Sequence, residues 1–459
     1  MTEAMITARR GSLVPPVIAL LAVIGCVVLA VMGHYLSFLF AALFTLLVCG
    51  LPIAISLAGS CLLYVMLTGR VPDVVVVHRM VNGIDSFPLL AIPFFILAGN
   101  LMNNGGITNR IFDFAKALMG WMRGGLGHVN VGASIVFSGM SGAAVADAGG
   151  LGTIEIKAMR DAGYDQEFAV GITAASSTIG PIIPPSLPMV IYGVMASVSV
   201  GQLFAAGLVP GLLMGLTLMA MITWLSWRRG YKRDARFSMS VLGRTFCRAF
   251  LSLLTPVIIV GGIVTGAFTP TEAAIAAVVY ALVLGGLVYR TLTWRRLLKV
   301  SMETIETTAV ILFIVAGASI FAWILTSNQV TQHVMGLLGP FQDNPVAVLL
   351  IVNLVLIVVG CFMETIAAIT ILVPVLLPVA VAAGVDPVHF GVIMVLNLMI
   401  GLLTPPVGMV LYVLSRVSHI SFEKCMRGTL PFLIPLVIAL GLVTFVPAIS
   451  LWLPTLVYR

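Results

Sequence analysis

The chain has 459 residues, of which 60% are hydrophobic and only 9% are charged. Soluble globular proteins carry about 25% charged residues, so most of this protein's surface cannot face water. The net charge of +7 does not indicate a nucleic-acid partner, because the basic residues gather in the loops on one side of the predicted membrane, as the positive-inside bias requires.

Apolar runs of about 20 residues, the length that crosses about 30 Å of hydrocarbon, recur along the whole chain. Arg9 and Arg10 precede the first of them, which we interpret as a retained signal anchor rather than a cleaved signal peptide. The sequence predicts a multi-pass, all-helical protein in a lipid bilayer. Eleven spans are expected, at about 13–33, 35–49, 51–69, 88–103, 167–198, 203–227, 249–267, 271–289, 307–326, 387–415 and 428–455.

The charges of the loops set the orientation of these spans. With the N-terminus in the cytoplasm, the loops rich in lysine and arginine fall inside, and those around Ser199, Thr269 and Asp386 fall outside. Arg70 and Arg79 are exceptions, because both fall outside.

Two further apolar stretches, 130–160 and 344–383, do not resemble ordinary spans. Small or polar residues interrupt each near its middle, at 138–142 and at 360–365. Non-helical backbone at membrane depth survives only where it is buried in protein or lines a watery cavity. We therefore predict two re-entrant helical hairpins.

Short matches relate the two halves of the chain. IGPIIPP at 179–185 resembles IGLLTPP at 400–406, and FILAG at 95–99 resembles FIVAG at 313–317. Chance similarity is the alternative, but the order and spacing of three features favour an inverted repeat. The predicted division is an extra N-terminal transmembrane helix at 1–34, scaffold helices at 35–87, a first repeat at 88–227 with hairpin 127–161 and broken helix 167–198, a basic cytoplasmic loop with scaffold helices at 228–306, and a second repeat at 307–459 with hairpin 344–383 and broken helix 387–415.

Prolines interrupt the two predicted broken helices. Each proline removes a backbone donor and obstructs the carbonyl one turn earlier, so the helix must unwind. The freed carbonyl oxygens can bind a hard cation such as Na⁺, and the N-terminal amides of the resuming half-helix favour an anion. A simple proline kink is the alternative, which the duplication disfavours.

Several hydroxyl and amide side chains are candidates to line these breaks. Ser138 and Ser141 lie at the first hairpin tip, where they could ligate Na⁺ or simply permit tight helix packing. The remaining candidates could line the transport path, although back-bonding to their own helix or helix capping would also explain them. They are Ser176, Ser177, Ser186, Asn100 and Asn397.

Asp147 and Glu364 place one acidic group on each hairpin. A carboxylate at membrane depth costs several kcal/mol unless it is paired or hydrated. No lysine or arginine occurs at 124–156, 161–227 or 300–415, so Na⁺, helix-end amides, water or protonation must stabilise these acids. Six scattered cysteines and six histidines indicate neither a disulfide frame nor a metal site beyond Na⁺, and we expect no cofactor.

Four motifs resemble the large membrane subunit, of DctM type, of TRAP (tripartite ATP-independent periplasmic) transporters. They are SGMSGAAVADAGGLGTIEIKAM at 138–159, SSTIGPIIPPS at 176–186, GAFTPTEAAI at 266–275 and ETIAAITILVPVLLP at 364–378. The resemblance extends over nearly the whole chain after residue 36. It implies an elevator-type fold in the bacterial inner membrane and Na⁺-driven uptake of an organic acid anion. It also implies two partners, a small four-helix membrane subunit and a periplasmic substrate-binding protein.

The resemblance also implies two Na⁺ sites. The first would use Ser141 with the backbone of Gly180, Ile183 and Pro185, and the second would use Glu364 and Thr365 with Gly401, Thr404 and Pro406. The sequence departs from the family in two places: Ala143 stands where many relatives have a tip serine, and Glu364 replaces a more usual aspartate. The helix before Tyr35 resembles the linking helix of fused forms.

A secondary active transporter, not an enzyme, is therefore the expected function. A stand-alone Na⁺/carboxylate symporter of the same superfamily is the alternative within transport. An intramembrane hydrolase using Asp147 and Glu364 is a remote alternative, because no GxGD or HExxH signature is present, and a structural scaffold is another. The residues leave the anion open among four-carbon dicarboxylates, keto acids, aromatic acids and sugar acids.

Overall fold

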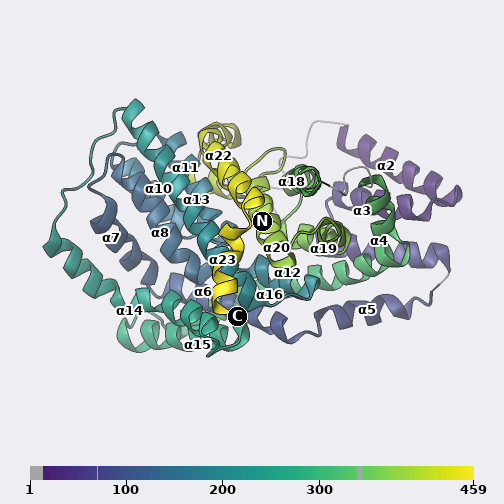
Figure 1. The fold of residues 1–459 in the computed structure, drawn as a ribbon, viewed down its shortest axis with the longest axis horizontal. Coiled ribbons are helices and arrows are strands. Elements are labelled where there is room, and N and C mark those ends of the chain that lie inside the picture. Colours follow the sequence, from purple (N-terminus) through teal and green to yellow (C-terminus); the bar gives the residue numbers. More distant parts are fainter. Residues whose placement is uncertain (1–13, 70, 339–343, 459) are drawn as a thin grey trace. The chain divides into compact units, whose positions relative to one another are not determined.

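Helices make up all the regular secondary structure of the computed structural model, which describes residues 14–69, 71–338 and 344–458 (Figure 1). Eight helical segments in this described part are long and apolar enough to cross a membrane. The prediction of an all-helical membrane protein is confirmed. The eight are Phe87–Asn104, Val200–Arg228, Met239–Val264, Pro270–Val288, Trp294–Ser327, Pro345–Phe362, Thr365–Ala382 and Phe422–Phe445.

The chain divides into two compact units, of which the first comprises residues up to Asp85 together with 310–330. In this unit Tyr64 donates its hydroxyl hydrogen to Asn328 Oδ1 at 3.1 Å. The guanidinium of Arg79, which the charge rule placed on the unexpected side, lies 5.2 Å from the centroid of the Trp323 ring. Its helices are α2 (Val14–Val31), α3 (Tyr35–Val48), α4 (Ile53–Thr68), α5 (Val74–Ile84) and the C-terminal part of α16 (Trp294–Ser327).

The second unit comprises residues 86–309 and 331–459. It contains both predicted hairpins and both broken helices. Its other helices are η1 (Phe87–Leu90), α6 (Ala91–Asn104), α7 (Ile107–Met119), α13 (Val200–Arg228), α14 (Met239–Val264), α15 (Pro270–Leu282), η2 (Val283–Val288), the N-terminal part of α16, α17 (Val330–Leu338), α22 (Phe422–Phe445) and α23 (Ala448–Val457).

The two halves of the second unit follow one order: a hairpin, a broken helix and a long helix. The helices break where small residues or prolines were expected to break them, so the prediction of two hairpins and two broken helices is confirmed. The first half has hairpin α8 (Gly125–Ser141), α9 (Ala144–Gly149) and α10 (Leu151–Asp161), then α11 (Gln166–Ser177), α12 (Leu187–Ala196) and α13. The second half has hairpin α18 (Pro345–Phe362) and α19 (Thr365–Ala382), then α20 (Pro387–Gly401), α21 (Met409–Ser418) and α22.

Some helix ends differ from the sequence-based expectation. The span expected at 428–455 is two helices, because the backbone at Val446 leaves the helical region and Pro447 then caps α23 at its N-terminus. The two arms of the second hairpin, α18 and α19, have 18 residues each, about 27 Å at 1.5 Å per residue. The short helices α5 and α7 were missed, because neither has a long continuous apolar run.

Candidate functional site

The first break, between α11 and α12, lies against the tip of the first hairpin. Gly142 at that tip has a φ of +63°, and a Cβ built there would lie 2.5 Å from the carbonyl oxygen of Pro185. Only a glycine therefore permits this approach of tip and break. Residues 168–193 are all buried, so the unwound backbone is enclosed by protein, as non-helical backbone at membrane depth requires.

Several carbonyl oxygens in the first break have no hydrogen-bond donor among the described residues. Those of Gly180, Ile183 and Pro185 are among them. The Pro181 carbonyl differs, because it accepts the hydroxyl hydrogen of Ser186. Buried carbonyl groups are almost always paired, so several unpaired oxygens on one short segment can serve as ligands for a hard cation.

The carboxylate of Asp147 points at the same segment. Asp147 is 2% exposed, and a Cβ on Gly180 would collide with its Oδ2 atom. The first hairpin thus places an acidic group directly beside Gly180 of the break. A carboxyl group next to a segment with unpaired backbone oxygens offers the oxygen ligands that a hard cation prefers.

The candidate serines around the first break have different local roles. Ser138 and Ser177 bond back to carbonyls of their own helices, to Ile135 at 2.6 Å and Ala174 at 2.8 Å. Ser186 caps α12, accepting the Met189 backbone N–H at 3.2 Å. The side chain of Ser141 lies outside the part of the chain that the structure describes.

The second break, between α20 and α21, meets the second hairpin in a matching way. A Cβ on Gly401 would lie 2.6 Å from the backbone of Gly360, and the Val407 backbone N–H donates to the Cys361 carbonyl at 3.2 Å. Thr404 Oγ1 lies 2.8 Å from Cys361 Sγ.

At the second break, one of the predicted backbone ligands is already hydrogen-bonded, and part of the segment is exposed. The Gly401 carbonyl accepts both the hydroxyl hydrogen of Thr404 at 2.8 Å and the Thr404 backbone N–H at 3.0 Å, so that oxygen is already engaged. The Pro406 carbonyl has no donor among the described residues. Pro405 and Pro406 are exposed, in contrast to the buried first break. The Pro184–Pro185 and Pro405–Pro406 peptide bonds are both cis.

Glu364 caps the second arm of its hairpin. Its Oε2 atom accepts the backbone N–H groups of Ile366 at 2.9 Å and Ala367 at 3.3 Å, at the start of α19. The neighbouring Thr365 is 2% exposed, and its Oγ1 has no hydrogen-bond partner among the described residues. The hairpin tip therefore combines a carboxylate that caps a helix with a buried hydroxyl oxygen that has no partner among the described residues.

A buried polar pair ties each break to the first arm of its own hairpin. Ser176 donates to Asn130 Oδ1 at 2.5 Å, and Asn397 Nδ2 donates to Asn353 Oδ1 at 2.6 Å. Asn130 and Asn353 were missed in the sequence, because an asparagine inside an apolar helix has no local signal that shows its partner. Asn397 Oδ1 is buried and lacks a partner among the described residues.

Two other polar groups lie apart from these links. Asn100 donates to Thr304 Oγ1 at 3.1 Å, a contact between α6 and α16. Glu155 on α10 was not a candidate, yet it is 1% exposed and its Oε1 has no hydrogen-bond partner among the described residues. Its side chain and Asp147 place two buried carboxylates in one arm, where like charges repel.

The two halves interlock through their hairpins. The second arm of each hairpin packs against the second half of the other broken helix, α9 against α21 and α19 against α12. Tyr192 on α12 also donates to the Pro387 carbonyl at the start of α20, at 2.6 Å. The described contacts therefore join both hairpins and both breaks into one body of packed helices.

Comparisons with known proteins agree with this arrangement. Residues 40–449 match the family described as "Tripartite ATP-independent periplasmic transporter, DctM component". The chain is 51% identical over 411 residues to the sialic acid TRAP transporter large permease protein SiaM of Vibrio cholerae, an alignment that covers 90% of this chain and 96% of that one. It is 45% identical over 407 residues to the sialic acid TRAP transporter permease protein SiaT of Haemophilus influenzae, over 89% of this chain and 66% of that one. Among solved structures, the Alcanivorax borkumensis YdaH transporter has a TM-score of 0.62 at 14% identity, over 83% of this chain and 88% of that one, which is a likeness of fold.

Proposed function

Because the chain belongs to the DctM component family of tripartite ATP-independent periplasmic transporters, we propose that it is the large membrane subunit of a Na⁺-coupled importer of an organic acid anion. One observation carries this proposal. Two unwound helix segments with unpaired carbonyl oxygens each lie against a hairpin tip. Oxygen ligands of this kind bind hard cations, and adjoining helix N-termini favour anions.

The first Na⁺ site would use the carbonyl oxygens of Gly180, Ile183 and Pro185, with the tip at Ser141 completing the shell. Their unpaired state supports this assignment. The second would use the Pro406 carbonyl with the hydroxyl groups of Thr365 and Thr404, near Gly401 and Glu364. The free Thr365 Oγ1 supports it.

Na⁺ would also compensate the charge of the transported anion. No lysine or arginine occurs between 161 and 227 or between 300 and 415, so both breaks lack a nearby basic residue on their own segments. Each net positive charge that enters gains about 2.3 kcal/mol per 100 mV of membrane potential. More than one Na⁺ per monovalent anion would therefore drive accumulation.

We further propose an elevator mechanism, in which the interlocked hairpins and broken helices move as one body. The packing of α9 on α21 and of α19 on α12 supports this, because it joins the two halves. Asp147, Ser176, Ser177, Ser186 and Asn397 would line the path of the anion beside the breaks.

The relatives suggest which anion and which partners to test first. Both relatives described above are named for sialic acid, and one of them is 51% identical to this chain. We propose a sugar acid of this type as the first substrate to test. The proposed partners are a periplasmic binding protein that delivers the anion and a small membrane subunit, in the bacterial inner membrane.

Uptake of labelled sialic acid into proteoliposomes that hold both membrane subunits tests the proposal. Uptake should require the binding protein on the outside and an inward Na⁺ gradient, and it should increase with an inside-negative potential. Succinate in place of sialic acid tests the substrate class separately. Accumulation that persists without a Na⁺ gradient would reject coupling, and uptake without the binding protein would favour a stand-alone symporter.

A further inference from the structure

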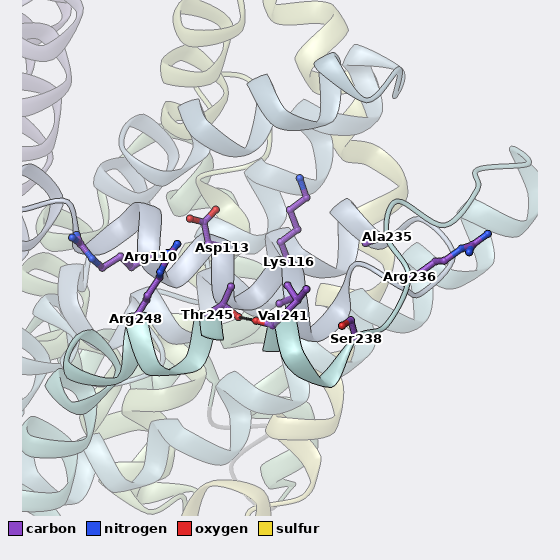
Figure 2. A pocket seen from close by; sticks show the side chains of 10 residues that line it. Arg110, Asp113, Lys116, Ala235, Arg236, Ser238, Val241, Thr245 and Arg248 are labelled. Atoms are coloured by element: carbon purple, nitrogen blue, oxygen red, sulfur yellow. Dashed lines mark hydrogen bonds between the residues drawn. The ribbon is translucent and has the colours of Figure 1, made fainter. Parts of the chain in front are cut away.

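A basic cavity of about 240 Å³ lies between α7 and the segment that leads into and begins α14 (Figure 2). Its charged lining consists of four basic groups and one acidic group, a formal charge of +3. None of them forms a salt bridge among the described residues, so the protein leaves most of this charge uncompensated. The charged residues are Arg110, Lys116, Arg236, Arg248 and Asp113.

The surrounding structure holds part of this basic lining in place. Arg110 donates to the Gly106 carbonyl at 2.7 Å, and its guanidinium lies 3.7 Å from the centroid of the Tyr289 ring. In Figure 2, Arg110 and Arg248 lie together at one end of the cavity and Arg236 lies at the other. Basic residues of α7, of α14 and of the segment before α14 thus line a space that is large enough for a phosphate diester.

An exposed apolar face continues from the cavity along α14. Phe246 and Phe250 are 42% and 45% exposed and contact each other with ring centroids 5.7 Å apart, and Val257 further along is 61% exposed. Most of the apolar stretch of α14 is not buried in the protein. Such a face can lie against acyl chains, while long basic side chains near the end of a span reach the membrane interface.

We propose that this cavity binds the headgroup of an anionic phospholipid, whose acyl chains lie along the exposed apolar face of α14. Charge complementarity favours an anionic over a zwitterionic headgroup, and basic pockets on the side of the basic loops are a known mode of lipid recognition. The positive-inside bias alone does not require basic residues as far apart in the sequence as Arg110 and Arg248 to line one cavity. The apolar face favours a lipid over a free phosphate.

Native mass spectrometry of the purified full chain tests this site, with phosphatidylglycerol and phosphatidylethanolamine of identical acyl chains as probes. Phosphatidylglycerol should bind more tightly, and rising salt should weaken its binding selectively. The double variant Arg236→Gln, Arg248→Gln should lower the affinity for phosphatidylglycerol on the order of tenfold or more. The matched control Arg244→Gln, Arg295→Gln removes two basic residues outside the cavity and should retain the affinity for phosphatidylglycerol.

Several results would overturn the proposal. Equal binding of the two lipids, or equal losses in the two double variants, would reduce the site to a diffuse basic surface. Glycerol 3-phosphate that binds as tightly as phosphatidylglycerol would show a soluble phosphate site instead of a lipid site. The comparison of the two lipids needs no variant, so it tests the proposal even where a double variant folds poorly.

Discussion

Ser176 Oγ lies 2.5 Å from Asn130 Oδ1 and joins α11 to the first arm of its hairpin. Ser176 precedes Gly180 by four residues, and Asn397, which bonds Asn353 at 2.6 Å, precedes Gly401 by the same number. The same polar link therefore occurs at equivalent places in both repeats. In each half it holds the helix that enters the break against the hairpin that covers the break.

Ser176→Ala should destabilise the protein by about 1–3 kcal/mol, because the buried amide oxygen of Asn130 loses its donor. The measurement is the thermal unfolding midpoint in detergent. Ser177→Ala is the matched control and should change it little, because the Ser177 hydroxyl bonds only to its own helix. If both variants lose the same stability, the link between the helices contributes nothing of its own.

The double variant Asn130→Ala, Ser176→Ala tests the same link by additivity. Because the two side chains form one hydrogen bond, the double loss should be smaller than the sum of the single losses. Additive losses would show that the two positions act independently.

Gly180→Ala should abolish Na⁺-dependent uptake, because its Cβ would collide with the Asp147 carboxylate. Overpacking of this kind costs about 1–3 kcal/mol, so the variant should remain folded while tip and break are displaced. Gly261→Ala on α14, where a Cβ meets nothing within 4 Å, is the control and should transport normally. Normal uptake by Gly180→Ala would show that the close approach has no role in transport.

Glu364→Ala should raise the Na⁺ concentration that gives half-maximal uptake. It also removes a helix cap, which costs about 1 kcal/mol, so the two effects must be separated. Asp386→Ala removes a comparable cap away from both breaks, in which the Val388 backbone N–H donates to Asp386 Oδ1 at 2.8 Å. Both variants should lose similar stability, and only Glu364→Ala should change the Na⁺ dependence. An equal Na⁺ dependence in the two variants would show that Glu364 acts only as a helix cap.

Tyr164→Phe should destabilise the protein by about 1–2 kcal/mol at neutral pH. Tyr164 donates its hydroxyl hydrogen to Asp234 Oδ2 at 2.6 Å, and the Leu126 backbone N–H donates to the same atom at 2.9 Å. Through these two bonds, Asp234 joins the basic loop to Tyr164 and to the start of α8. The control Tyr412→Phe removes the hydroxyl group of an exposed tyrosine and should have little effect on the unfolding midpoint.

The same bond predicts a dependence on pH. Burial, followed by the neighbouring Asp234, raises the pKa of Tyr164 above its unfolded value of about 10. Its contribution is therefore fully present below pH ~10 and is lost as the pH rises further. The unfolding midpoint of the unmodified protein should fall more steeply above pH ~10 than that of Tyr164→Phe. Parallel curves would contradict this assignment.

Much of the architecture follows from local properties that the sequence displays. A proline removes its backbone donor wherever it stands, so the breaks at 178–186 and 402–408 could be located without coordinates. The hairpins followed from small and polar residues within apolar runs. Helix ends were harder to place, because the apolar run continues through Val446, where only the following Pro447 disfavours helical backbone.

By itself, the sequence determined the membrane setting, the two hairpins, the two broken helices and the repeat, because each depends on residues close together in the chain. Only the tertiary structure decided that Ser176 meets Asn130, that Glu155 is buried, and that the first break is enclosed while Pro405 and Pro406 are exposed. It also brought Arg110 and Arg248 to one cavity. These relationships depend on contacts between segments far apart in the chain, and hydrophobic burial, which drives such packing, is non-directional and specifies no partner.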